Sequence, residues 1–149
     1  MATETSPVPL NIVGMKVATI VVRVLLGLMF VVFGANAIHP FLKMGDMPQG
    51  LAGDFTRALF VSNYFKAIGV FQVIGGLLLL LGFVPLGLLF LGPILVNILL
   101  FHIFLLPKGI EMGIVASLLA LFLLWAYRRS FAGLVITPKR PPTSPSATT

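Results

Sequence analysis

The chain contains no cysteine and very little charge. Without cysteine it has no disulfides, no thiol redox relay and no cysteine-ligated iron–sulfur or zinc site. Only 9% of its 149 residues are charged and only four are acidic, whereas soluble domains carry about 25% charge. The sequence also shows no pair of carboxylates, no nucleophile beside a base and no phosphate-binding glycine loop, so it carries no recognisable catalytic motif.

Hydrophobic residues, in contrast, make up 58% of the chain, and the mean hydropathy is +1.10. A 16.0 kDa protein has too little interior to hide so much apolar surface from water. This excludes a soluble enzyme, a nucleic-acid-binding domain and a disordered protein. The net charge of +6 is spread between apolar runs without a basic stripe. The expected partner is therefore a lipid bilayer, not nucleic acid.

The apolar residues are concentrated in four runs. Each run is about as long as the 20 residues that a helix needs to cross a membrane, and a chain segment in lipid must be helical to pair its backbone groups. The sequence thus predicts an all-α integral membrane protein, a four-helix transmembrane bundle. The predicted spans are Val17–Ile38, Tyr64–Phe83, Leu86–Leu106 and Ile110–Tyr127.

The connections between the runs differ in length. Short turns rich in proline or glycine follow the second and third runs, which predicts two tight hairpins. The first connection is long, and its second half, from Asp54, predicts a short amphipathic helix on the membrane surface, capped by Asp54 or Gly53. The predicted organisation is a flexible arm at 1–16, a membrane domain at 17–129 and an interfacial, then disordered tail at 130–149.

Basic residues near the span ends predict the orientation in the membrane. Four spans place both termini on one side. That side holds six lysines and arginines, against four on the other: Lys16, Arg23, Arg128, Arg129, Lys139 and Arg140 against Lys43, Arg57, Lys66 and Lys108. We therefore expect both termini in the cytoplasm of a bacterial cell, with the protein in its inner membrane.

Polar side chains within or at the ends of the spans are costly in lipid and suggest function. Seven of the eight fall in the outer half or the middle of the membrane, and only Arg23 falls in the inner half. This distribution predicts a polar cavity that opens outward between the helices. The candidate ligand-binding residues are His102, Asn97, Gln72, Asn36, Arg23 and Glu111; His39 and Lys66 are assigned to the interface.

Helical spacing refines these roles. Gln72 shares a face with Gly69, Gly75 and Gly76, where small residues allow close helix contact, so it should point into the bundle. Asn97 and His102 lie about 140° apart around their helix. Unless Pro93 changes this geometry, one should face the cavity and the other a neighbouring helix.

Each polar residue also has a structural alternative. Arg23 fits a side chain that extends to the headgroups, and Gln72 and Asn97 fit hydrogen bonds between helices. His102 is suited to carrying protons, to hydrogen-bonding a quinone oxygen or to ligating a metal. A haem held by His39 and His102 is a further geometric alternative, but we predict no metal site.

Three segments resemble the DoxX family of membrane proteins. They are Arg23–Asn36, with arginine, glycine and phenylalanine at matching intervals, Gln72–Gly82, with a polar residue before paired glycines, and Pro93–Pro107, with Asn97 and His102 at polar positions. The resemblance covers about residues 17–129. Family members carry an acidic or an amide residue where Gln72 stands. Because this chain has an amide there, the resemblance does not imply proton transfer at this position.

The resemblance implies a four-helix membrane subunit associated with redox enzymes. A quinone is then the candidate cofactor, and the implied partner is a redox enzyme or another membrane subunit. Whether the chain is itself an enzyme stays open. Two other hypotheses fit the residues: a small-solute transporter or channel that uses the same cavity, and a scaffold subunit without a ligand.

Overall fold

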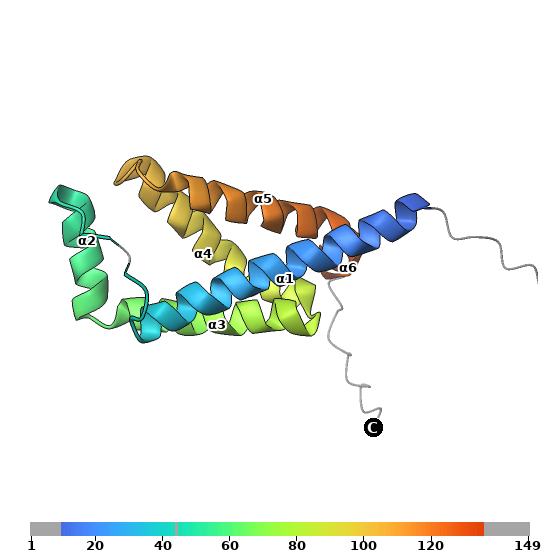
Figure 1. Cartoon of the computed structure of the whole chain (residues 1–149), viewed down its shortest axis with the longest axis horizontal. Helices are drawn as coiled ribbons and strands as arrows, with labels where there is room; N and C mark the ends of the chain where they lie inside the picture. Colours follow the sequence, from blue (N-terminus) through green and yellow to red (C-terminus); the bar gives the residue numbers. More distant parts are fainter. Residues whose placement is uncertain (1–9, 44, 136–149) are drawn as a thin grey trace, which may run out of the picture.

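The computed structural model describes residues 10–43 and 45–135, and within them it contains six helices (Figure 1). Four long helices form the bundle, and two short ones, α2 and α6, lie at its opposite ends. The helices are α1 (Leu10–Ile38), α2 (Gly50–Val61), α3 (Tyr64–Leu81), α4 (Val84–Phe104), α5 (Ile110–Ala126) and α6 (Arg128–Val135).

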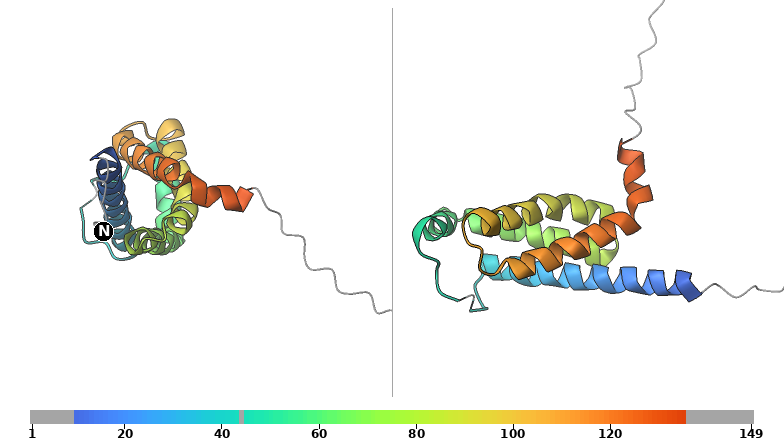
Figure 2. Two further views of the ribbon diagram at one scale, coloured as in Figure 1. Left: turned by 90° about the vertical axis from the view of Figure 1, so that its right-hand side faces the viewer. Right: turned by 90° about the horizontal axis from the view of Figure 1, so that it is seen from above.

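Three of these helices, α1, α3 and α4, are long and apolar enough to cross a membrane, and α5 is a shorter apolar helix. With 17 residues, α5 is about 25 Å long, at the lower limit for a span. Successive long helices run in opposite directions, so the described chain begins and ends at the same end of the bundle (Figures 1 and 2). We call this the α6 end and the opposite one the α2 end. The predicted all-α membrane bundle is confirmed.

Glycines bring α1 and α3 into backbone contact. Gly34 lies opposite Gly69, and a Cβ on either would lie 2.7 Å from the carbonyl oxygen of the other. Two turns further along, Gly27 and Gly76 repeat the arrangement, with 3.0 and 2.7 Å. In lipid, where apolar contacts alone give little drive for association, such close backbone packing holds helices together.

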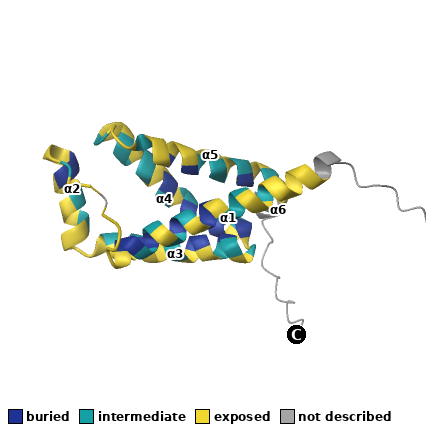
Figure 3. Cartoon of the chain, viewed as in Figure 1, coloured by how far each residue is buried: buried dark blue, intermediate teal, exposed yellow. Residues whose placement is uncertain are grey.

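The core lies mainly in the half of the bundle toward the α6 end (Figure 3). Leu26, Leu79, Val84 and Leu123 are fully buried there, one from each long helix. The turn between α3 and α4 closes this half: Gly82 has φ of 95°, and the backbone N–H of Phe83 donates to the carbonyl of Leu78. This left-handed glycine cap ends α3 and lets α4 turn back at once.

Three predicted boundaries differ from the structure by more than two residues or in the type of element, and the ends of the other spans differ by one or two residues. The first helix starts at Leu10 and not at Val17, so part of the predicted arm is helical. The predicted start of the loop helix was wrong as well: α2 begins at Gly50, with Gln49 in the cap position and no side-chain cap bond. Since Ala52 and Gly53 are buried, packing sets this start. The predicted interfacial tail begins as α6, and residues 1–9 and 136–149, with Lys139 and Arg140, lie outside the described residues.

Candidate functional site

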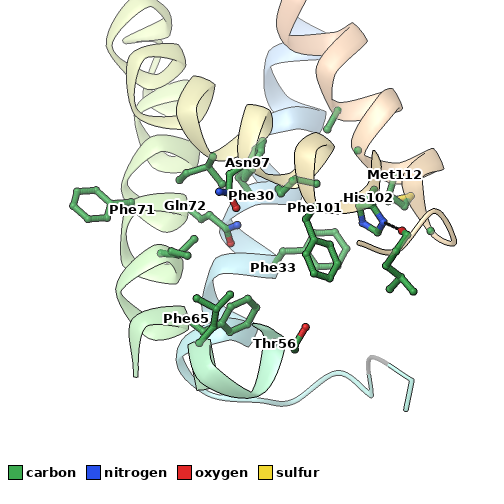
Figure 4. A pocket seen from close by; sticks show the side chains of 18 of the residues that line it. Phe30, Phe33, Thr56, Phe65, Phe71, Gln72, Asn97, Phe101, His102 and Met112 are labelled. Carbon is green, nitrogen blue, oxygen red and sulfur yellow. Dashed lines mark hydrogen bonds between the residues drawn. The ribbon is translucent and has the colours of Figure 1, made fainter. Parts of the chain in front are cut away.

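A cavity of about 1230 Å³ lies between the four long helices, toward the α2 end (Figure 4). It exists because the helices do not stay equally close along the bundle: α5 approaches α1 near the α6 end and separates from it toward α2 (Figure 1). Four residues of α2, Phe55, Thr56, Leu59 and Phe60, contribute to its wall, as does the loop segment 45–48. The amphipathic helix therefore covers one end of a cavity.

Aromatic rings dominate the lining. Eight of the chain's 13 phenylalanines line the cavity. Three ring pairs join the surrounding helices, with centroid separations of 4.6 to 6.0 Å: Phe55 with Phe101, Phe60 with Phe65, and Phe71 with Phe90. Such pairs stabilise a wall beyond their buried area. The cavity was predicted to be polar, but its surface is mostly apolar.

Three of the six candidate ligand-binding residues line this cavity: Gln72 from α3, and Asn97 and His102 from α4. Gln72 is only 9% exposed, and its Cβ packs against α1, 2.8 Å from where a side chain on Gly34 would begin. Figure 4 shows the amides of Gln72 and Asn97 on the same side of the cavity. Together they place two amide groups, each with a donor nitrogen and an acceptor oxygen, in a mostly apolar wall.

Asn97 and His102 both face the cavity, whereas helical spacing predicted that only one of them would. Both line the cavity, although they lie five residues apart on α4. The reason is its size: a cavity this wide is bordered by a broad arc of α4, so two directions that differ by about 140° both reach its surface.

His102 has a defined hydrogen bond. Its Nδ1 lies 2.8 Å from the carbonyl oxygen of Leu106, one turn later, where α4 ends. The edge of the Phe101 ring packs nearly perpendicular to the imidazole, at 81°. These contacts fix the ring at the junction of α4 and α5, with one nitrogen engaged by the backbone.

The other three candidates lie outside the cavity lining. Asn36 is buried, and its Oδ1 accepts hydrogen bonds from the backbone N–H groups of Phe41 and Leu42, at 2.9 and 2.7 Å. It thus closes the turn that follows α1. Glu111 lies exposed in the first turn of α5, where a carboxylate interacts favourably with the helix dipole.

Arg23 lies in the other half of the bundle. Its Nη1 would be 3.2 Å from a side chain on Gly82, in the α3–α4 turn. There the guanidinium is near the C-terminal carbonyls of α3, a position that favours a cation. Its Nε is buried and has no hydrogen-bond partner among the described residues. Arg23 therefore belongs to the closed half of the molecule and is remote from the cavity.

Metal-ligating side chains do not gather in the part of the chain that the structure describes: nowhere in it do three His, Cys, Asp or Glu residues come together. The cavity is equipped instead for hydrogen bonding and for aromatic contact. Sequence reasoning missed the phenylalanines. The sequence offered two signals for them. Phenylalanine is abundant, with 13 residues in the chain, and Phe30 and Phe33 are three residues apart, so they share one face of α1.

A molecule held here would thus have a large apolar part and a small polar one. Its apolar part would contact the rings, while Gln72, Asn97 and His102 offer hydrogen bonds. Comparisons with protein-family models, with curated proteins and with solved structures found no match for this chain.

Proposed function

We propose that the chain is a DoxX-like, redox-associated membrane subunit that binds a quinone-type molecule in the cavity between its helices. The supporting observation is the combination of a cavity of about 1230 Å³, eight phenylalanines and a few polar side chains. Gln72, Asn97 and His102 lie among the spanning helices, and Asp46, Thr56 and Tyr64 lie at the α2 end of the lining. Ligand sites are commonly about 300–1,000 Å³, mostly apolar, with a few placed polar groups. This volume accommodates an aromatic headgroup and part of a hydrocarbon tail.

The polar residues decide which molecule binds. A membrane-dissolved ligand leaves a lipid environment that is as apolar as the phenylalanine wall, so burial of its tail adds little affinity. A hydrogen bond made inside the cavity is different, because hydrocarbon offers the headgroup no partner. Selectivity therefore rests on Gln72, Asn97 and His102, and the rings supply shape and contact.

Solute transport is the second hypothesis, and the distribution of polar groups counts against it. A path for a polar solute needs polar groups along its whole length. The cavity's amide and imidazole side chains lie at the middle of the helices or nearer the α2 end, while the α6 half is filled by the apolar core. A scaffold role without a ligand leaves the cavity unexplained.

Alanine at both His102 and Asn97 should weaken binding of a quinone-type molecule in its hydroquinone form by about thirtyfold. Each lost hydrogen bond costs about 1 kcal/mol, and 2 kcal/mol corresponds to about thirtyfold in Kd. The measurement is equilibrium binding of a radiolabelled decyl-hydroquinone to the protein in lipid nanodiscs, without oxygen.

The matched control carries alanine at Glu111 and Ser117, two polar residues of α5 that lie outside the cavity lining. It should bind like the unsubstituted protein. Unchanged binding in the His102 and Asn97 double variant, or equal losses in both double variants, would contradict the proposed site. If the unsubstituted protein binds no quinone-type molecule, the scaffold hypothesis is favoured.

The sequence count of six lysines and arginines on the side of the termini, against four on the other side, supports the proposed orientation in a bacterial inner membrane, with both termini cytoplasmic. Because the chain has no cysteine, single cysteines report it directly. Ser62 and Ser130 are both exposed, at opposite ends of the bundle. In intact spheroplasts a membrane-impermeant maleimide should label Ser62→Cys fully and Ser130→Cys only after permeabilisation. The reverse pattern would place the cavity toward the cytoplasm.

A further inference from the structure

The hydrogen bond of His102 fixes which of its ring nitrogens carries the proton. A carbonyl oxygen only accepts hydrogen bonds. Since Nδ1 lies 2.8 Å from the carbonyl oxygen of Leu106, Nδ1 must be the donor. In the neutral imidazole the proton is then on Nδ1, and Nε2 carries a lone pair and accepts.

The backbone makes this arrangement a property of the fold. Leu106 follows directly on the last turn of α4, and its own N–H donates to the carbonyl of Phe101. Its carbonyl therefore has a set direction beside the His102 ring, as the dashed line in Figure 4 shows. Gly109 borders the same ring edge, since a Cβ there would lie 3.4 Å from Cε1.

His102 thus differs from the two amides of the cavity. Gln72 and Asn97 each offer a donor and an acceptor and adapt to a carbonyl or a hydroxyl by rotation. The neutral His102 ring, with its donor used by Leu106, offers only an acceptor at Nε2. A carbonyl oxygen placed against this lone pair would make no hydrogen bond, whereas a hydroxyl would donate one.

We propose that the cavity selects a headgroup that donates a hydrogen bond, a phenol or hydroquinone, over the corresponding quinone, and that His102 is the residue that determines this selectivity. The inference rests on the proposed function, because it assigns the preferred redox form of the molecule proposed for this site. It makes the subunit a site where the reduced carrier is held. The structure assigns no electron-transfer step to the chain.

The test compares three tail-matched probes in nanodiscs, without oxygen and at about pH 8, where imidazoles are ordinarily neutral. They are decyl-benzoquinone, its hydroquinone and the dimethyl ether of the hydroquinone. One net hydrogen bond is worth about 0.5–1.5 kcal/mol, so the hydroquinone should bind about two- to twelvefold more tightly than the other two.

Two variants assign the preference to His102. In His102→Phe the ring shape stays and both nitrogens are lost, so the three probes should bind equally. In His102→Gln the side-chain oxygen restores an acceptor, and part of the preference should return. The fold of each variant is checked by its thermal unfolding in detergent.

The outcomes separate the two proposals. If no probe binds the unsubstituted protein, the proposed function fails. If quinone and hydroquinone bind equally well, or the quinone binds more tightly, the cavity holds such a molecule but the inference about His102 is wrong. A hydroquinone preference that persists in His102→Phe also overturns the inference and assigns selectivity to another acceptor of the lining, such as an amide oxygen or the carboxylate of Asp46.

Discussion

Replacing Gly34 by leucine should prevent the bundle from assembling. A Cβ at this position would lie 2.7 Å from the carbonyl oxygen of Gly69, 2.8 Å from Cβ of Gln72 and 2.9 Å from the backbone nitrogen of Val73. Two of these neighbours are backbone atoms and cannot move aside without displacing α3. Overpacking by a methylene costs about 1–3 kcal/mol, leucine adds four carbons, and total stabilities are about 5–15 kcal/mol.

The expected result is a drop of more than about tenfold in folded protein, read as the monodisperse peak in fluorescence-detected size exclusion. Gly34→Ala should give an intermediate result, a folded protein with a lower midpoint of thermal unfolding. The control is Gly92→Leu, in the middle of α4, because a Cβ on Gly92 meets nothing within 4 Å. A Gly34→Leu protein that elutes and unfolds like the unsubstituted one would show that α1 and α3 do not pack through these glycines.

This contact also explains where the cavity lies. The glycine pairs hold α1 against α3 along their common length. The contacts of α4 and α5 are less uniform: Gly75 and Gly87 pack against side chains of the neighbouring helix in the closed half, with Leu91 and Leu79 as partners. Toward the α2 end, α4 is joined to α2 by the large rings of Phe55 and Phe101.

The helices could be predicted from the sequence because their signal is simple. Length and apolarity mark a span, and a run of about 20 apolar residues allows little else. The direction of Gln72 also followed from sequence, since Gly69 and Gly76 on the same face indicate a close helix contact. The first signal is the apolar run itself, and the second depends on glycines and an amide that stand out within such a run.

The cavity could not be predicted in the same way. Ile94, Leu95 and Val96 are consecutive and similar in hydropathy, yet the first lines the cavity, the second is buried in the core and the third is exposed. A helix that is apolar on all sides carries no periodic signal to separate these positions. In the bilayer, lipid-facing and cavity-facing surfaces demand the same kind of side chain.

Asn36 and Glu111 were predicted to bind a ligand for a different reason. Asn36 satisfies the backbone where α1 ends, and Glu111 follows the turn at Gly109 at the start of α5. Their depth in the membrane resembles that of His102, so depth alone does not distinguish a side chain that completes a turn from one that faces a cavity. What separates them is whether the side chain borders the space between the helices, as His102 does and Asn36 and Glu111 do not. That depends on how the helices separate, which composition does not encode.

Replacing Asn97 by phenylalanine should abolish ligand binding and leave the fold as stable as before, or more stable. Asn97 lines the cavity while its side chain is exposed, so a larger side chain enters open space and displaces no buried atom. The added ring occupies volume needed by the headgroup and removes one hydrogen-bonding group. Binding should weaken by more than about thirtyfold, the equivalent of 2 kcal/mol.

The thermal stability of the Asn97→Phe protein should not fall along with its binding. The substitution removes an amide from an apolar wall and brings a ring beside Phe30, which is near Asn97 in Figure 4. We therefore expect the midpoint of thermal unfolding in detergent to stay level or rise, while binding of the tail-bearing probe is lost. Loss of binding together with a lower midpoint would indicate damage to the fold and would not support the site.

The neighbouring residue supplies the control. Val96 is 56% exposed and lies outside the cavity lining, so Val96→Phe adds a comparable ring to the same turn of α4 on its outer surface. It should change neither binding nor the unfolding midpoint. Because the two positions differ in direction and hardly in depth, a difference between their variants isolates occupancy of the cavity from the general effect of a phenylalanine in this helix. Equal binding by Asn97→Phe and Val96→Phe would mean that the ligand does not occupy this cavity.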